Sequence, residues 1–85
     1  MKLAIISVRD IVANAYHTPT YHQNKGTALR SFGQEVNRAD ENNSIYKFPD
    51  DYELMYLGTF DDQNATFELV SIPEQLGLAR DYVIK

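Results

Sequence analysis

The chain contains no cysteine and no tryptophan, and its four glycines are scattered. Without cysteine there can be no disulfide, no thiolate metal ligand and no cysteine nucleophile. The glycines form no phosphate-binding loop, and neither a G-x-S-x-G nor an H-E-x-x-H motif occurs. His17 and His22 are separated by Pro19, so they cannot form a zinc-binding pair on a regular helix. We therefore expect no cofactor, no metal and no enzymatic activity.

Long apolar runs are also missing. The longest, Leu3–Ile6, is far shorter than the roughly 18 residues of a membrane span, so we expect no membrane association and no signal peptide. With 85 residues, the chain is expected to form a single domain over residues 1–85. So short a chain buries only about 60–65% of its unfolded surface, which favours stabilisation by a partner subunit.

Charge is distributed unevenly along the chain, whose formal net charge is −4. Residues 1–39 carry a net charge of +3, residues 40–74 of −8 and residues 75–85 of +1. A basic first half permits a nucleic-acid surface on an acidic protein, although a solvated surface explains the same distribution.

Three segments show the two-residue alternation of β-strands. Lys2–Val8 is apolar on both sides, which is typical of an interior strand covered by a helix or by a partner. Tyr52–Phe60 and Ala65–Ser71 are separated by the turn residues Asp61–Asn64 and predict a hairpin.

Helical spacing occurs twice. Lys25–Ala39 has an apolar stripe of helical period and is capped by Asn24 or Thr27, and Pro73 suits the first turn of a short C-terminal helix. We predict that the stripe packs on a sheet face formed by Leu54, Tyr56, Phe60, Phe67 and Leu69. The fold class expected is α+β: a small antiparallel or mixed sheet of three to four strands, with one main helix and a short C-terminal helix packed on one face.

The stretch Asp10–Asn24 predicts an extended surface loop with a short edge strand near Tyr21. It contains two Tyr-His pairs, and several cations follow it. Proteins hold single-stranded DNA by combining flat rings, on which bases stack, with cations that track the phosphates. We predict a weak single-stranded DNA site formed by Lys25, Arg30, Arg38, Tyr16, Tyr21, His17 and His22. In the alternative, one tyrosine packs into the core or a dimer interface and the histidines face water.

Three motifs occur together in a recognisable order: N-K-G-T-A-L-R-S-F (Asn24–Phe32), F-P-D-D-Y-E-L-M-Y-L-G-T-F-D (Phe48–Asp61) and P-E-Q-L-G-L-A (Pro73–Ala79). Over nearly the whole chain they resemble the small nonstructural protein of gokushovirus-type microviruses, which are phages with circular single-stranded DNA. The resemblance implies a replication-associated, DNA-binding protein in the host bacterial cytoplasm. It carries over no catalytic or binding residues.

Two functions are therefore expected as alternatives. The first is a non-enzymatic phage protein that assists viral single-stranded DNA synthesis by weak DNA binding. The second is a protein-interaction module that recruits or inhibits a host or viral replication protein through its acidic half. We also expect a homodimer, because the first strand is apolar on both sides and the chain offers only one long helix to cover it.

Overall fold

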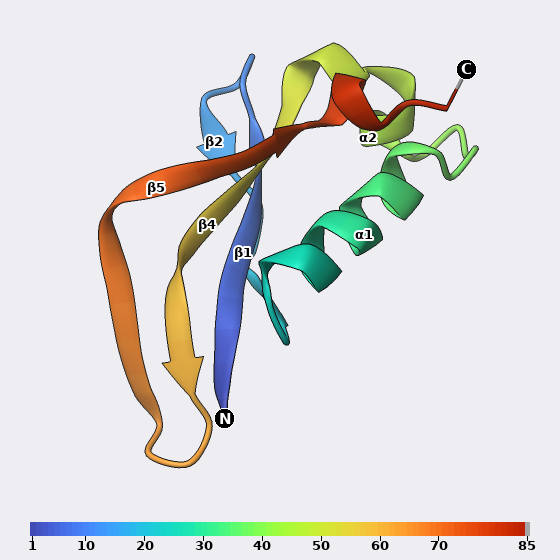
Figure 1. The fold of residues 1–85 in the computed structure, drawn as a ribbon. Helices are drawn as coiled ribbons and strands as arrows, with labels where there is room; N and C mark the ends of the chain where they lie inside the picture. The colour runs from blue at the N-terminus through green and yellow to red at the C-terminus, as the bar shows by residue number, and fades with distance from the viewer. Residues whose placement is uncertain (85) are drawn as a thin grey trace.

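A curled antiparallel sheet carries one main helix, as Figure 1 shows, and the expected α+β class is confirmed. The computed structural model describes residues 1–84. The elements in chain order are β1 (Lys2–Asp10), β2 (Ala15–Tyr16), β3 (Thr20–His22), α1 (Lys25–Val36), α2 (Ser44–Lys47), the 3-10 turn η1 (Pro49–Asp51), β4 (Tyr52–Asp61), β5 (Thr66–Leu78) and the 3-10 turn η2 (Ala79–Tyr82). None of the helices within this part of the chain is long and apolar enough to cross a membrane.

β1 is the central strand of the sheet. It pairs with β4 along one edge, and β3 and β2 pair in turn with its other edge. The interior position predicted from its apolar residues is confirmed, and so is the short edge strand near Tyr21, which is β3. The sheet has one more strand than predicted, because the segment before α1 contributes two short strands.

Helix α1 begins at a capping box and is followed by an asparagine C-cap. The Asn24 side chain accepts a hydrogen bond from the Thr27 amide, and the Thr27 hydroxyl accepts one from the Asn24 amide. The helix ends at Val36, three residues before the predicted end at Ala39. Asn37 is the C-cap, and its side chain donates hydrogen bonds to a carbonyl of α1 and to one of η2. These bonds fix the C-terminal segment against the end of the helix.

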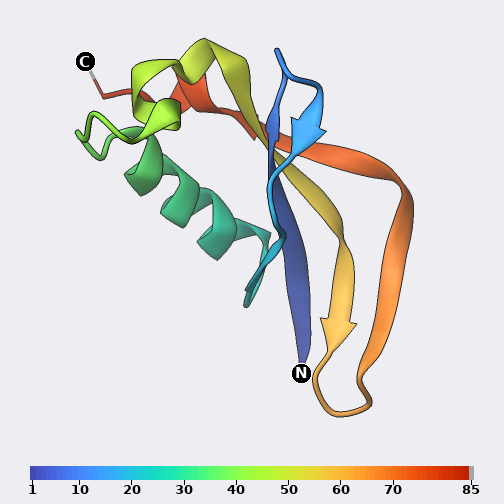
Figure 2. The same cartoon turned by 180° about the vertical axis from the view of Figure 1, so that it is seen from behind.

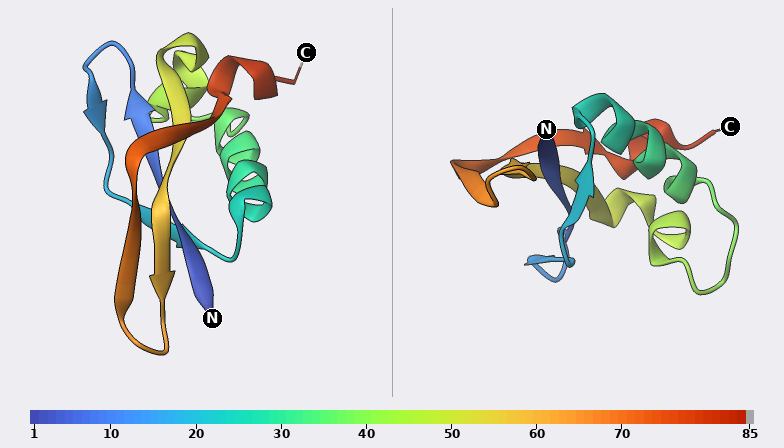
Figure 3. Two further views of the ribbon diagram at one scale, coloured as in Figure 1. Left: turned by 60° about the vertical axis from the view of Figure 1, so that its left-hand side comes forward. Right: turned by 90° about the horizontal axis from the view of Figure 1, so that it is seen from below.

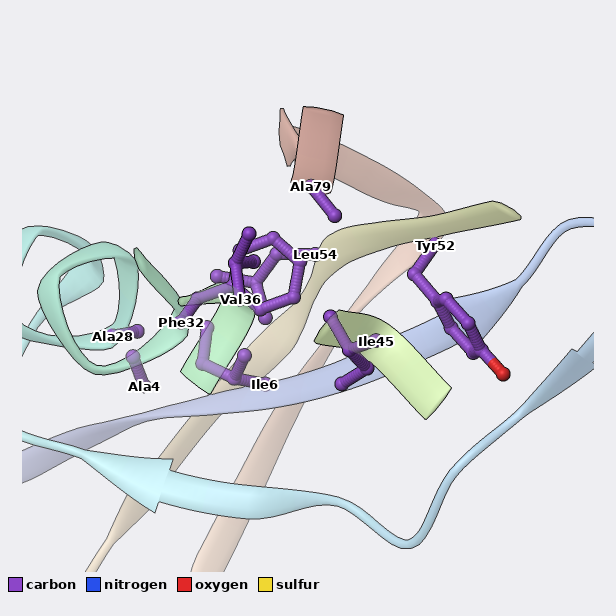
Figure 4. Packing of buried hydrophobic residues seen from close by; sticks show 9 residues of the cluster. All are labelled: Ala4, Ile6, Ala28, Phe32, Val36, Ile45, Tyr52, Leu54 and Ala79. Atoms are coloured by element: carbon purple, nitrogen blue, oxygen red, sulfur yellow. The ribbon is translucent and has the colours of Figure 1, made fainter. Parts of the chain in front are cut away.

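The core lies between α1 and one face of the β1–β4 pair (Figure 4). Phe32 is 4% exposed, and its ring packs edge to face on Tyr82 at a centroid distance of 6.2 Å. The buried cluster consists of Ala4, Ile6, Ala28, Phe32, Val36, Ile45, Tyr52, Leu54 and Ala79. The predicted contact between the helix stripe and Leu54 is thus confirmed.

One extra residue interrupts the pairing of β4 with β1. Ile6 pairs with Tyr56 and Ile5 pairs with Gly58, which leaves Leu57 as a β-bulge. Because successive side chains of a strand alternate between faces, one extra residue moves every later side chain to the other face.

The bulge changes which residues α1 covers. Leu54 and Tyr56 precede it and lie on the helix side, as predicted. Phe60 follows it and lies on the face opposite α1, and its β5 partner Phe67 lies there too, together with Leu69. The prediction that Phe60, Phe67 and Leu69 lie beneath the helix is therefore wrong.

The predicted C-terminal helix is also corrected. Pro73 does not begin a helix, because β5 continues to Leu78 and only the turn η2 follows. Pro73 lies where β5 bulges away from β4, between the paired residues Leu69 and Glu74. At such a bulge the missing amide proton costs no ladder hydrogen bond. On the side of this bulge that leads to the β4–β5 turn, the hairpin projects from the body of the protein, as Figures 1 and 2 show from opposite sides.

Phe32→Ala should lower the free energy of unfolding by about 3–5 kcal/mol, because it leaves a cavity in a thin core. Urea unfolding followed by circular dichroism measures this loss. Ser31→Ala, an exposed neighbour on the same helix, is the control and should change the value by less than about 0.5 kcal/mol. Equal stability of the two variants would contradict the packing described.

Gly58→Ala should destabilise the protein far more than Gly33→Ala. Gly58 has φ +146°, and a Cβ there would lie 2.7 Å from Leu69 Cα and would also overlap the Glu68 carbonyl oxygen. The backbone conformation alone costs about 1–3 kcal/mol for another residue. A Cβ on Gly33 would make an ordinary 3.6 Å contact with the Tyr82 ring, and alanine favours the helix by about 1 kcal/mol. Thermal melts of both variants check the difference, and a Gly58→Ala protein as stable as the parent would contradict the bulge.

Candidate nucleic-acid interface

The structure divides the predicted DNA site among three regions. Tyr16 and His17 lie at the β2 end of the sheet, and Arg38 lies beyond the C-terminus of α1. The other residues lie in β3 and the first half of α1: Tyr21, His22, Lys25 and Arg30. These seven side chains therefore do not form one continuous surface.

At the β2 end, the two rings have separate surroundings. Tyr16 is 45% exposed, whereas the His17 ring packs edge on against Tyr52 at a centroid distance of 5.9 Å. The His17 backbone is held as well, because its carbonyl accepts a hydrogen bond from the Ser7 hydroxyl at 2.7 Å. Tyr16 pairs with Arg9 and Tyr21 pairs with Ile5, so the two tyrosines lie on one face of the sheet but four residues apart along β1.

Tyr21 and His22 are neighbours in β3 and lie on opposite faces of the sheet. Tyr21 pairs with Ile5 on the face away from α1, and His22 pairs with Ala4 on the helix side. The His22 Nε2 atom lies 3.0 Å from the Thr20 hydroxyl. Of the two rings, only His22 therefore shares a face with α1.

Behind His22, a cleft of about 230 Å³ opens between α1 and the edge of the sheet. Its floor is the apolar core, and its polar lining is Thr20, His22, Ser31 and Glu35. Ligand sites usually measure about 300–1,000 Å³, so this cleft is small for one. No three histidine or carboxylate side chains within residues 1–84 gather as a metal site would require.

At the start of α1, Lys25 already forms an ion pair and a cation–π contact. Its ammonium lies 3.0 Å from the Glu74 carboxylate and 4.3 Å from the centroid of the Tyr56 ring. Arg30 is exposed and forms no ion pair with any residue of the described chain. Arg30 is therefore the most accessible cation of the predicted site.

Arg38 is held by two carboxylates. Its guanidinium lies 2.7 Å from Glu35 and 2.9 Å from Asp40. The hydrogen bonds from Arg38 lower the pKa of Glu35, and the Asn42 amide and then Arg38 lower the pKa of Asp40. Arg38 lies past the end of α1 and outside the helix that was predicted to reach Ala39, so it does not share a helix face with Arg30.

The remaining charges of the described chain are mostly negative. The side chains without an ion-pair partner among residues 1–84 are the cations Arg30, Lys47 and Arg80 and the acids Asp10, Glu41, Asp50, Asp51, Asp61 and Asp81. A phosphate backbone requires unneutralised cations, so this balance opposes tight DNA binding.

An aromatic row on the helix-free face was not predicted. The ring centroids of Tyr21 and Phe60 are 5.8 Å apart, and those of Phe60 and Phe67 are 4.8 Å apart. Leu3 pairs with Phe60, and Leu69 follows Phe67 on the same side of β5. We call these five residues (Leu3, Tyr21, Phe60, Phe67 and Leu69) the aromatic face. Tyr21, Phe67 and Leu69 are 49%, 55% and 68% exposed.

The aromatic face has no unpaired charge of its own. The charged residues on this side of the sheet are Arg9 and Glu53, which are 2.6 Å apart, and Gln75 donates a further hydrogen bond to Glu53. Glu53 is 6% exposed, so its charge is compensated inside the protein. The face is therefore apolar and electrically neutral on an acidic molecule.

The family model of the Phage ORF5 protein matches residues 3–82. The chain belongs to this family. No curated protein and no solved structure gives a match. The matched residues run from β1 into η2 and include the hairpin that bears the aromatic face. Membership confirms a phage protein, and the narrower gokushovirus assignment stays a prediction.

Arg38→Gln should make stability less sensitive to acid. In the parent, the lowered pKa values of Glu35 and Asp40 contribute stability that is present above the unfolded values of about 4.5 and 3.8 and is lost as pH falls through the folded values. The variant should therefore be less stable than the parent at neutral pH, and this difference should shrink as pH falls below the unfolded values. Urea midpoints of the parent and the variant, measured from neutral to acidic pH, give the difference in stability, with Lys47→Gln as the control. A difference in stability that is independent of pH would contradict the role given to Arg38.

Proposed function

We propose that this Phage ORF5 family protein is a non-enzymatic accessory of viral single-stranded DNA synthesis that acts by protein contact. The role in DNA synthesis follows the resemblance of its motifs to the small nonstructural protein of gokushovirus-type microviruses. The mode of action is supported by the aromatic face, an exposed apolar row on the sheet side that α1 leaves bare.

The aromatic face suits a protein better than it suits DNA. Exposed aromatic and aliphatic side chains without unpaired charge are the usual composition of an interface core. DNA stacking sites also use rings, but they combine them with cations, and no free cation lies among the five residues of this face. The acidic charge of residues 40–74 would repel a phosphate backbone further.

A test in infected cells compares two exposed apolar residues changed to aspartate. Leu69→Asp alters the aromatic face, and Val12→Asp alters the β1–β2 turn, where Val12 is 76% exposed. Leu69→Asp should lower the ratio of single-stranded progeny DNA to double-stranded replicative DNA, because a buried unpaired charge opposes docking. Val12→Asp should leave the ratio unchanged. Equal ratios in parent and Leu69→Asp would contradict the proposal.

The second candidate is weak single-stranded DNA binding near the start of α1. Arg30, which has no ion-pair partner in the described chain, favours it, and His22 lies on the same side of the sheet. With so few available cations, the slope of log affinity against log salt should be no steeper than about −2.

Titration of labelled single-stranded DNA between about 50 and 200 mM salt separates the two candidates. Protein contact as the sole mode predicts no binding at micromolar protein concentrations, for the parent and for Arg30→Glu alike. Micromolar binding by the parent that Arg30→Glu abolishes would establish the DNA site instead. Lys47→Glu is the matched charge reversal on α2.

A further inference from the structure

We infer that the aromatic face binds a second copy of this chain, so that two sheets pack face to face about a twofold axis. This inference rests on the proposed function, in which the same face is a protein contact. It names the partner as the protein itself.

The protein is larger and more open than a compact monomer of its mass. A monomer of 9.7 kDa exposes about 5,100 Å² on average, whereas this chain exposes 5584 Å². Its radius of gyration is 13.2 Å, against about 12 Å for a compact domain of 85 residues. The projecting β4–β5 hairpin accounts for the length, with principal extents of 41 × 23 × 20 Å (Figure 3).

The exposed apolar area is of the size that a small dimer needs. If a large side chain offers about 200 Å² when fully exposed, the exposed fractions of Tyr21, Phe67 and Leu69 amount to about 350 Å². Partly exposed Leu3 and Phe60 add to it. A standard interface buries about 800 Å² per partner, of which about two thirds is apolar in homodimers. The aromatic face thus supplies most of the apolar core of such an interface.

The charge distribution is compatible with a second copy at this face. Each molecule carries a formal charge of −4, so two copies repel each other least when they meet through a neutral surface. The aromatic face is such a surface, since Arg9 and Glu53 neutralise each other on its flank. A twofold axis opposes the face to its own copy, which makes every favourable contact twice.

The arrangement of layers leaves the face accessible. Helices α1 and α2 lie to one side of the sheet. The β4–β5 hairpin, which bears Phe60, Phe67 and Leu69, extends away from them, as the opposite views of Figures 1 and 2 show. Two sheets can therefore approach to the usual separation of about 10 Å without meeting a helix. In such a dimer both α1 helices and both Arg30 side chains remain on the outside.

Sedimentation velocity from micromolar to several hundred micromolar protein tests the inference. The parent should sediment as a dimer at the higher concentrations. Leu69→Asp and Phe67→Asp should sediment as monomers with a folded circular dichroism spectrum, and the matched control Val12→Asp should remain a dimer. A parent that is monomeric throughout, or a Leu69→Asp variant as dimeric as the parent, would overturn the second-copy interface.

A second measurement serves if the aspartate variants do not fold. Methyl NMR shifts of Leu69 in the parent should change with concentration while those of Val12 stay constant, and constant Leu69 shifts would overturn the inference. The two proposals fail separately. A monomeric parent whose Leu69→Asp variant still loses progeny DNA would retain protein contact as the function and would exclude the second copy as the partner.

Discussion

The β-bulge at Leu57 determines which side chains of the sheet the helix α1 covers. Before the bulge, Tyr52, Leu54 and Tyr56 of β4 face α1 and pack in or against the core. After the bulge, the alternation of side chains places Phe60 on the face away from the helix. Gly58 makes this possible, because its positive φ and its close approach to β5 leave no room for a Cβ. One inserted residue thus gives a short chain two apolar surfaces, of which its helix covers one.

This division also explains why the protein is suited to binding. A chain of 85 residues has too little helix to cover both faces of a sheet, and a bare antiparallel face is normally polar. Here the bare face carries a row of rings from three strands, whereas most cations of the described residues are engaged by carboxylates. An uncovered apolar surface together with neutralised cations supports protein contact as the main mode of action.

Local patterns in the sequence predicted the elements well. The period of Lys2–Val8, the apolar stripe of α1, the Asn24 cap and the turn at Asp61–Asn64 depend on near neighbours, and each was found. The facing of Phe60 and Phe67 could not be predicted, because a bulge is a property of the pairing between strands; Gly58 within a strand pattern was its only local signal. The predicted DNA site was dispersed for a related reason, since the partners of Lys25 and Arg38 are set by tertiary contacts and by the end of α1.

The position of the Phe60 ring shows whether the bulge is present. Nuclear Overhauser effects measured on labelled protein report which side chains lie near it, and at low concentration they do so within one molecule. The bulge predicts contacts from Phe60 to Tyr21 and Phe67 and none to the α1 residues Ala28 and Phe32. Contacts from Phe60 to α1 would show an unbroken alternation along β4, and would remove both the aromatic face and the interface inferred from it.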